Sequence, residues 1–304
     1  MRLMKETGMK SKRFGKITIV LCCIAIFAAT TWFCIKMNKR KETLTQMPEN
    51  NVETVYVTKD RILGDNKEDF DTKTLTAEAY FEKNKEDMKL LEAYRQYNSD
   101  VYGIIRIEGT KLNHPVMKSD EDADFYLTHD LDKKINSHGV PFIEPKDDFD
   151  SENGNTIVYG HRMGDGDVFG ELSKYESIDY YKEHPVIETV SERGTARWLI
   201  VACCLVCNYD EDAFYYFDNN DFLSLAEYEN YMEEIQKRNL LKIPAKLSVE
   251  DAYLTLSSCS KEKIGEGTGR IIIMAVRIKN NENYGKTVEE SSINPSPLLP
   301  EKMR

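Results

Sequence analysis

The sequence predicts a mainly β protein with flanking helices, in which the strands form an antiparallel β-barrel. Two observations predict this fold class. Between residues 101 and 278, apolar residues fall into short runs that turn-forming residues interrupt. The periodicity of an α-helix occurs in only two segments, one before these apolar runs and another before the last two runs. Many short strands with so few helices favour a closed sheet over alternating α/β layers.

The individual elements follow in order along the chain. An amphipathic helix is predicted from residue 76 to 97, and a second helix from 225 to 240. The polar tail 281–304 contains several prolines and is predicted to be disordered. The residues near one face of the first helix are Tyr80, Met88, Leu91 and Tyr94. The predicted strands are 104–107, 114–117, 139–143, 156–159, 197–207, 252–256 and 270–278.

Composition and charge exclude several functional classes. Of the 304 residues, 41% are apolar and 31% are charged, which excludes a polytopic membrane protein. The net charge of −11 is unevenly spread, because the first 41 residues hold ten basic residues and a single acidic one. The remainder therefore holds 31 basic and 51 acidic residues, and such a surface repels phosphate backbones. We expect no nucleic-acid partner.

The N-terminal region is predicted to anchor the protein in a membrane. Residues 17–35 are 19 residues without charge, Gly or Pro, and as a helix they span about 28 Å. The basic segment 1–16 is expected in the cytoplasm, which places the rest of the chain outside the cell. A cleaved signal peptide is the alternative, but Cys34-Ile35-Lys36 is not a small-x-small cleavage site. The polar residues 36–75 are expected to form an extracellular tether.

Four of the seven cysteines lie in the predicted barrel. Cys203, Cys204 and Cys207 lie within one apolar strand, where successive residues alternate between faces, and we expect them to be buried. A zinc site would need a second pair of ligands elsewhere, and neither another Cys-x-x-Cys nor paired histidines supply one, so no metal is expected. Cys259 differs, because it ends a strand and precedes a polar, glycine-rich loop. An accessible thiol at this position is a candidate nucleophile if a cation or a histidine lies near it.

Two candidate partners of Cys259 lie at other strand ends. His161 follows the strand 156–159, so its imidazole projects just beyond that strand. Arg270 opens the last strand, and the loop 260–269 allows this strand to return antiparallel beside the strand of Cys259. This pairing would place a fixed positive charge near the thiol.

The other histidines give no comparable signal. His114 and His184 each precede a proline and are expected at turns or strand edges. His129 and His138 lie in a charged loop, and the acidic side chains within 120–124 are interpreted as a solvated face.

Three motifs in this order resemble the sortase family. The segment 255–259, Thr-Leu-Ser-Ser-Cys, is similar to the Thr-Leu-x-Thr-Cys signature of sortases. The strand that ends in Tyr-Gly-His at 159–161 resembles their histidine-bearing strand, and Gly-Arg-Ile-Ile at 269–272 resembles their arginine-bearing last strand. Further similar phrases within 101–127 and 161–170, together with the two helices, look like class B sortases. The resemblance covers roughly residues 76–280, the predicted catalytic domain.

The resemblance implies a sortase-like barrel that acts as a cysteine transpeptidase, within the cysteine-peptidase class of enzymes. Cys259 would be the nucleophile and His161 the general acid, while Arg270 would hold the substrate and stabilise the oxyanion. Ser258 and Leu256 belong to the same motif and are expected to contact the substrate.

The resemblance also implies partners. The substrates would be secreted surface proteins with a C-terminal sorting motif of the Asn-Pro-x-Thr type, cleaved after Thr through a thioacyl intermediate. The acceptor would be the amine of a lipid-linked peptidoglycan precursor or a pilin lysine. No cofactor is implied, and the anchor would hold the enzyme at the cell membrane.

The sequence departs from the family pattern at two places. Ser258 stands where sortases usually have Thr, so we expect altered packing rather than loss of activity. Ser260 and Lys261 follow the cysteine where some class B members place an acidic residue, so no fourth catalytic residue is assigned. Two alternatives to transpeptidation remain: an inactive sortase-like binding or assembly module, and a thiol peptide hydrolase.

Overall fold

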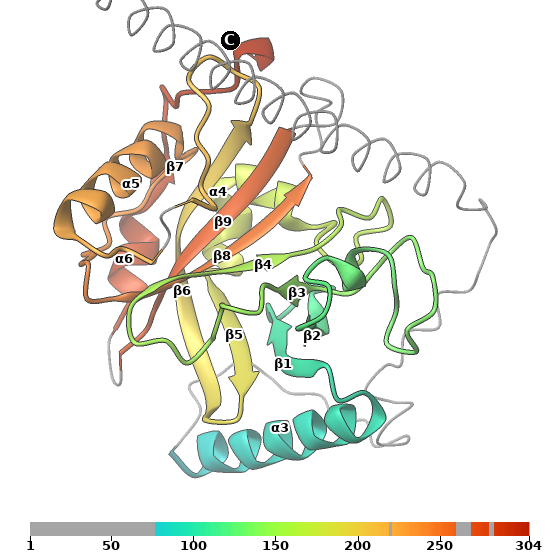
Figure 1. Ribbon diagram of the computed structural model, residues 1–304. Helices are drawn as coiled ribbons and strands as arrows, with labels where there is room; N and C mark the ends of the chain where they lie inside the picture. The colour runs from blue at the N-terminus through green and yellow to red at the C-terminus, as the bar shows by residue number, and fades with distance from the viewer. Residues whose placement is uncertain (1–76, 219–220, 260–268, 280–282, 304) are drawn as a thin grey trace, which may run out of the picture. The chain divides into compact units, whose positions relative to one another are not determined.

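Eight strands close into a barrel in the order β1-β2-β3-β4-β8-β9-β6-β5 (Figure 1). The computed structural model describes residues 77–218, 221–259, 269–279 and 283–303, which all belong to one compact unit. The predicted mainly β class and the closed barrel are thus confirmed. The barrel strands are β1 (Val101–Arg106), β2 (Asn113–Lys118), β3 (Phe142–Ile143), β4 (Gly154–Tyr159), β5 (Val186–Ser191), β6 (Gly194–Cys207), β8 (Ala252–Cys259) and β9 (Gly269–Arg277).

The strand pairings are mostly antiparallel, with two exceptions that position the site. β2 pairs with β3 in parallel, and β4 pairs with β8 in parallel from Gly154↔Ala252 to Tyr159↔Ser257. β8 and β9 form an antiparallel pair that ends at Cys259↔Arg270. Because parallel strands end at the same edge of a sheet, the C-terminal ends of β4 and β8 meet where β9 begins.

Side chains from alternate positions of β8 and β9 fill two separate cores. Leu254, Leu256, Ile271 and Ile273 point into the barrel interior and pack around Trp198. The neighbouring residues of β8 and β9 point to the opposite face and pack beneath α5 (Leu225–Arg238). This alternation is the period of two that the pleat of a strand imposes.

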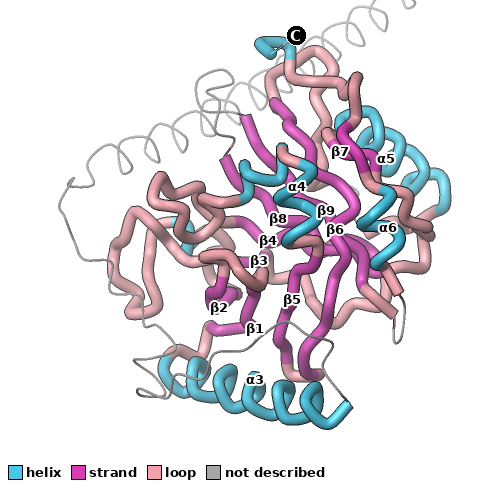
Figure 2. The backbone as a smooth tube through the Cα atoms, turned by 180° about the vertical axis from the view of Figure 1, so that it is seen from behind, coloured by secondary structure: helices cyan, strands magenta, loops and turns pink. Residues whose placement is uncertain are grey.

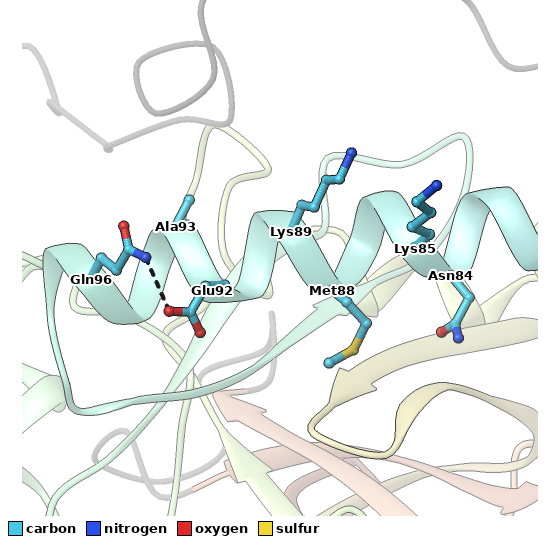
Figure 3. Close-up of a pocket in the computed structure, with 7 residues that line it drawn as sticks. All are labelled: Asn84, Lys85, Met88, Lys89, Glu92, Ala93 and Gln96. Carbon is cyan, nitrogen blue, oxygen red and sulfur yellow. Dashed lines mark hydrogen bonds between the residues drawn. The ribbon is translucent and has the colours of Figure 1, made fainter.

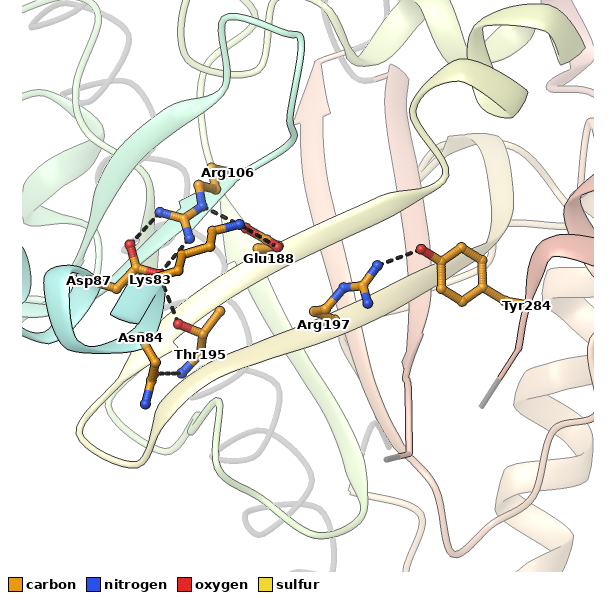
Figure 4. A network of polar contacts seen from close by, with 8 residues as sticks. All are labelled: Lys83, Asn84, Asp87, Arg106, Glu188, Thr195, Arg197 and Tyr284. Carbon is orange, nitrogen blue, oxygen red and sulfur yellow. Dashed lines mark hydrogen bonds and ion pairs between the residues drawn. The ribbon is translucent and has the colours of Figure 1, made fainter. Parts of the chain in front are cut away.

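The helix α3 (Ala77–Tyr97) runs across one end of the barrel (Figures 1 and 2). Its predicted apolar face is confirmed at Leu91 and Tyr94, which are buried against strand residues. An ionic network fastens the helix to the barrel (Figure 4). The Asp87 carboxylate accepts hydrogen bonds from Arg106 Nη1 and Nη2 at 2.7 and 2.6 Å, and Arg106 Nε binds Glu188 at 2.7 Å.

The predicted second helix is confirmed as α5, inserted between β6 and β8. Ser224 caps its start, because the hydroxyl accepts a hydrogen bond from the backbone N–H of Glu227 at 3.2 Å. Ile235 and Tyr231 are buried against the barrel wall. Short elements that the sequence analysis did not include are η1 (Phe125–Leu127), η2 (Leu172–Glu176), α4 (Ile178–Glu183), β7 (Leu241–Lys242) and the strand β5.

The prediction of a disordered tail is wrong for residues 283–303. This segment forms α6 (Gly285–Glu290), β10 (Ser292–Ile293) and η3 (Glu301–Met303). β10 pairs with β7, and the Leu298 N–H donates to the Lys237 carbonyl at 2.7 Å. Polar composition did not prevent order here, because backbone hydrogen bonds to the body of the protein hold the tail in place.

The structure leaves the predicted N-terminal segments untested. In the part of the chain that it describes, no helix is both long enough and apolar enough to cross a bilayer. The basic segment 1–16, the predicted anchor 17–35 and the predicted tether 36–75 all lie outside the described residues.

Candidate functional site

Cys259 is the last residue of β8 and carries a half-buried thiol. Its partner in the ladder is Arg270, the second residue of β9, as the sequence analysis predicts. The Arg270 Nη1 atom lies 3.7 Å from the Cys259 sulfur and donates a hydrogen bond to it. The guanidinium thus places a fixed positive charge directly beside the sulfur.

His161 lies two residues beyond the C-terminal end of β4, the strand that runs parallel to β8. Two hydrogen bonds fasten the residue before it to the cysteine strand. The Gly160 N–H donates to the Ser257 carbonyl at 3.2 Å, and the Ser258 hydroxyl donates to the Gly160 carbonyl at 2.9 Å. The fold thus brings His161, Cys259 and Arg270 to one edge of the barrel.

A hydrogen bond sets the tautomer of His161. Its Nε2 lies 2.8 Å from the backbone carbonyl of Leu127. Since a carbonyl only accepts, Nε2 carries a proton, and Nδ1 is the basic nitrogen of the neutral ring. Burial lowers the pKa of His161, and the positive charges of His138 and Arg270 lower it further, against the opposing effect of the Leu127 carbonyl. The neutral imidazole is therefore favoured at neutral pH.

Gly160 is required at this position for steric reasons. A Cβ atom built on Gly160 would lie 2.7 Å from the Phe169 ring, well inside van der Waals contact. Phe169 is buried in the barrel core, and its N–H donates to the His161 carbonyl at 3.0 Å. A larger residue at 160 would push apart the segment that presents His161.

The structure does not support substrate contact by Ser258 and Leu256. Leu256 is fully buried and packs in the barrel interior. Ser258 is 2% exposed, and its hydroxyl is engaged with Gly160. Because residues alternate along a strand, both side chains point to the face opposite Cys259. The expectation is corrected: Ser258 links two strands of the site, and Leu256 is a core residue.

The sequence analysis missed Tyr216, which lies on the same face of β8 as Cys259. Its hydroxyl is 2.7 Å from the Ser257 hydroxyl, and its carbonyl accepts a hydrogen bond from Tyr231 at 2.9 Å. Tyr216 is buried, which raises its pKa, and it lies close enough to feel the charges of Arg270 and Cys259. The aromatic run Phe-Tyr-Tyr-Phe at 214–217 was the signal that could have indicated it.

The remaining barrel cysteines are buried, as predicted. Cys203 packs in the barrel interior and Cys204 beneath α5, so the two thiols point to opposite faces of β6. Burial raises the pKa of Cys203 well above its usual range, and that of Cys204 to about 12. Neither thiol is available as a nucleophile at neutral pH.

A surface hollow of about 580 Å³ lies along α3, away from these residues (Figure 3). All of the described residues that line it belong to this helix, and none of the predicted site residues is among them. The lining residues are Asn84, Lys85, Met88, Lys89, Glu92, Ala93 and Gln96.

A closed barrel that presents a thiol, a guanidinium and an imidazole at neighbouring strand ends defines a cysteine-dependent enzyme. Comparison with known proteins then identifies the family. The sortase domain model matches residues 105–278, more than half of the chain. The chain therefore belongs to the sortase family of cysteine transpeptidases, and it is most like the class B sortases.

The individual relatives agree with this assignment. Sortase B of Staphylococcus aureus is 28% identical over 188 residues, which cover 62% of this chain and 74% of that protein. Sortase B of Listeria monocytogenes is 28% identical over 183 residues, covering 60% and 72% respectively. Among solved structures, a sortase B–substrate complex from S. aureus matches with a TM-score of 0.56 at 25% identity, covering 66% of this chain and 95% of that one.

Proposed function

We propose that this chain is a membrane-anchored transpeptidase in which Cys259, His161 and Arg270 carry the reaction. It would cleave a C-terminal sorting motif of the Asn-Pro-x-Thr type after Thr and join the new carboxyl end to a cell-wall amine. The observation that carries the proposal is the contact of 3.7 Å between the Arg270 guanidinium and the Cys259 sulfur. The neighbouring hydrogen bonds that fasten the His161 segment to the same strand support it.

In the first step, the Cys259 thiolate attacks the carbonyl carbon of the Thr residue, and a C–S bond forms. The carbonyl oxygen becomes an oxyanion, and the Arg270 guanidinium is placed to stabilise it. Collapse of this intermediate breaks the C–N bond, and the protonated fraction of His161 donates its proton to the departing amine. The products are a thioester on Cys259, a free amine and a neutral imidazole.

In the second step, an acceptor amine attacks the thioester and gives a proton to the neutral His161. The C–S bond then breaks, the new amide is released, and Cys259 returns as a thiolate beside Arg270. Water in place of the amine would give hydrolysis. The lowered pKa of His161 suits the base role in this second step.

The acceptor is proposed to be a lipid-linked peptidoglycan precursor amine or a pilin lysine. A cytoplasmic segment 1–16, an anchor 17–35 and a tether 36–75 would hold the catalytic domain on the outer face of the cell membrane, where exported substrates and the precursor both occur. The uncharged run at 17–35 supports this location.

The test uses the full-length chain in detergent with a peptide that contains an Asn-Pro-x-Thr motif, with and without an amine acceptor. Mass spectrometry should detect a ligated product from the unmodified protein and none from Cys259→Ala. The matched control is Cys207→Ala, which removes a buried thiol from β6, on the far side of β9, and should retain ligation. Hydrolysis alone, whether or not amine is present, would favour the thiol hydrolase. Ligation by Cys259→Ala would refute the assignment of the nucleophile.

A further inference from the structure

A second group of ionisable side chains gathers beside the segments that hold His161. Asp165 and Asp167 follow His161 in the loop between β4 and η2, and His138 lies in the loop between η1 and β3. One donor atom from each of His138, Asp165 and Asp167 lies within 4.8 Å of the other two. The His138 Nε2 and Asp165 Oδ2 atoms are 3.8 Å apart.

A second imidazole points into this group from a different element. His114 lies on β2, is 7% exposed, and has its Nε2 atom 3.1 Å from Asp167 Oδ1. Two imidazoles and two carboxylates from three separate segments thus converge. These groups are too far apart in the sequence for spacing to reveal them, and none takes part in the proposed transpeptidation.

We propose that His138, Asp165 and Asp167 form a binding site for a divalent transition-metal ion of the zinc class, with His114 orienting Asp167. Imidazole nitrogen and carboxylate oxygen ligands bind such ions at about 2.0–2.2 Å. In tetrahedral coordination at these bond lengths, two ligands of one ion lie about 3.3–3.6 Å apart, slightly closer than the 3.8 Å between His138 Nε2 and Asp165 Oδ2. Since the three donor atoms lie within 4.8 Å of one another, small side-chain rotations would bring them onto one ion.

The donor set favours transition metals over calcium and magnesium. Those two ions prefer oxygen ligands alone, whereas imidazole favours zinc and its neighbours. His114 Nε2 lies 3.1 Å from Asp167 Oδ1, where an outer group that supports a ligating carboxylate is usually found.

The hydrogen bonds that the two carboxylates accept are compatible with this set of metal ligands. Asp165 Oδ1 accepts from the Asp167 N–H at 3.0 Å, and Asp167 Oδ1 accepts from the Val168 N–H at 2.9 Å. Lys111 directs its Nζ to the backbone carbonyl of Asp165 at 2.5 Å. Two carboxylates two residues apart repel each other, and a bound cation would relieve that repulsion.

A cation here would join the two segments that hold His161. One segment supplies the Leu127 carbonyl that binds His161 Nε2, and it continues to His138. The other begins with His161 itself and continues to Asp165 and Asp167. Metal binding would restrain these segments relative to each other, without a ligand drawn from the catalytic residues.

The experiment is calorimetric titration of the metal-free, full-length chain in detergent with Zn²⁺, and then with Ca²⁺. We expect one Zn²⁺ per chain at this site and weaker binding of Ca²⁺. His138→Gln and Asp165→Asn should each weaken that Zn²⁺ binding by about tenfold or more. Asp120→Asn is the matched control, because Asp120 is an exposed acid in the same β2–β3 connection as His138, and it should bind as the unmodified protein does.

Cysteine thiols also bind zinc, but zinc bound at a thiol would contribute equally to the titrations of all four proteins. Superimposable titrations of the unmodified protein and both site variants would overturn the proposal, as would absence of Zn²⁺ binding. Asn at 165 retains an oxygen that can accept from the Asp167 N–H, so this variant should fold normally. Thermal unfolding in the presence of chelator checks that assumption. The measurement needs no peptide cleavage, so its outcome is independent of the proposed function.

Discussion

Ser258→Ala tests whether the fold positions His161 through the hydroxyl that precedes the nucleophile. The Ser258 hydroxyl is buried and donates to the Gly160 carbonyl at 2.9 Å. The substitution removes this bond and deprives a backbone acceptor beside His161 of its donor. Loss of such a buried hydrogen bond costs about 1–2 kcal/mol of unfolding free energy. If the same amount of positioning is lost in the transition state, kcat/KM for ligation falls by about tenfold.

The assay compares urea denaturation and peptide ligation for three variants. Ser258→Thr retains the hydroxyl, restores the residue typical of the family, and should keep kcat/KM within about threefold of the unmodified protein. Ser191→Ala is the matched control, because Ser191 is 3% exposed and donates to Asp150 Oδ1 at 2.8 Å on a different strand. It should lose a similar unfolding free energy with no change in kcat/KM.

Two results would refute this reasoning. If Ser258→Ala lost stability as expected but kept full ligation activity, the hydroxyl would be structural and would not position His161. If Ser191→Ala lost as much activity as Ser258→Ala, the effect would follow from general destabilisation. A decrease confined to Ser258→Ala, with recovery in Ser258→Thr, supports the positioning role.

Three further predictions concern stability, each measured by urea denaturation. Burial raises the pKa of Asp147 from 3.8 to about 6. The folded protein therefore holds this proton more tightly than the unfolded chain does, and the free energy of unfolding falls as the pH rises between these two values. Asp147→Asn should abolish this fall and add up to about 3 kcal/mol at pH 7.5; an unchanged pH profile would contradict it. Burial lowers the pKa of His161 below 6.5, so the folded protein binds this proton less tightly and loses stability as pH drops below 6.5. His161→Gln should flatten that loss, and an equally steep profile would argue against the burial of the ring. Asp87→Ala leaves the buried Arg106 without its bidentate partner and should cost about 3 kcal/mol. Its control Glu82→Ala breaks an exposed pair and should cost below about 0.5 kcal/mol; equal costs would contradict the role of the network.

Local patterns were sufficient to predict most elements of the barrel. The strand of Cys259 and that of Arg270 are separated by a short loop, so their antiparallel pairing could be inferred from the sequence alone. The helices α3 and α5 followed from periodicity. The short strand β5 was missed, although its sequence, Val-Ile-Glu-Thr-Val-Ser, is compatible with a strand in which the charged Glu188 binds Arg106.

Features that depend on distant contacts could not be predicted in this way. The tail 283–303 is polar, and contacts with distant segments, among them α5, β7 and β6, hold it in place. The cluster of His138, Asp165 and Asp167 exists only because two loops meet beside His161. The expected substrate contact of Leu256 was wrong because a motif records which residues occur together, not which face of the strand each occupies.

The parallel pairing of β4 with β8 is the feature on which the site depends most. The two strands are separated in sequence by β5, β6 and α5, so no local signal specifies their neighbourhood or their register. This register pairs Tyr159 with Ser257. The next residues, Gly160 and Ser258, can then form their hydrogen bond, and His161 reaches the edge of the sheet where Cys259 ends β8.

A slip of one residue in β8 would turn Cys259 into the barrel interior and Ser258 outward. The apolar run of β9 resists such a slip only weakly, because both faces of this strand are apolar. The polar groups Thr255, Ser257 and Ser258 each have a specific hydrogen-bond partner, and a slipped register would leave all three buried without it. We infer that these hydroxyls fix the register, and with it the alignment of the thiol with Arg270.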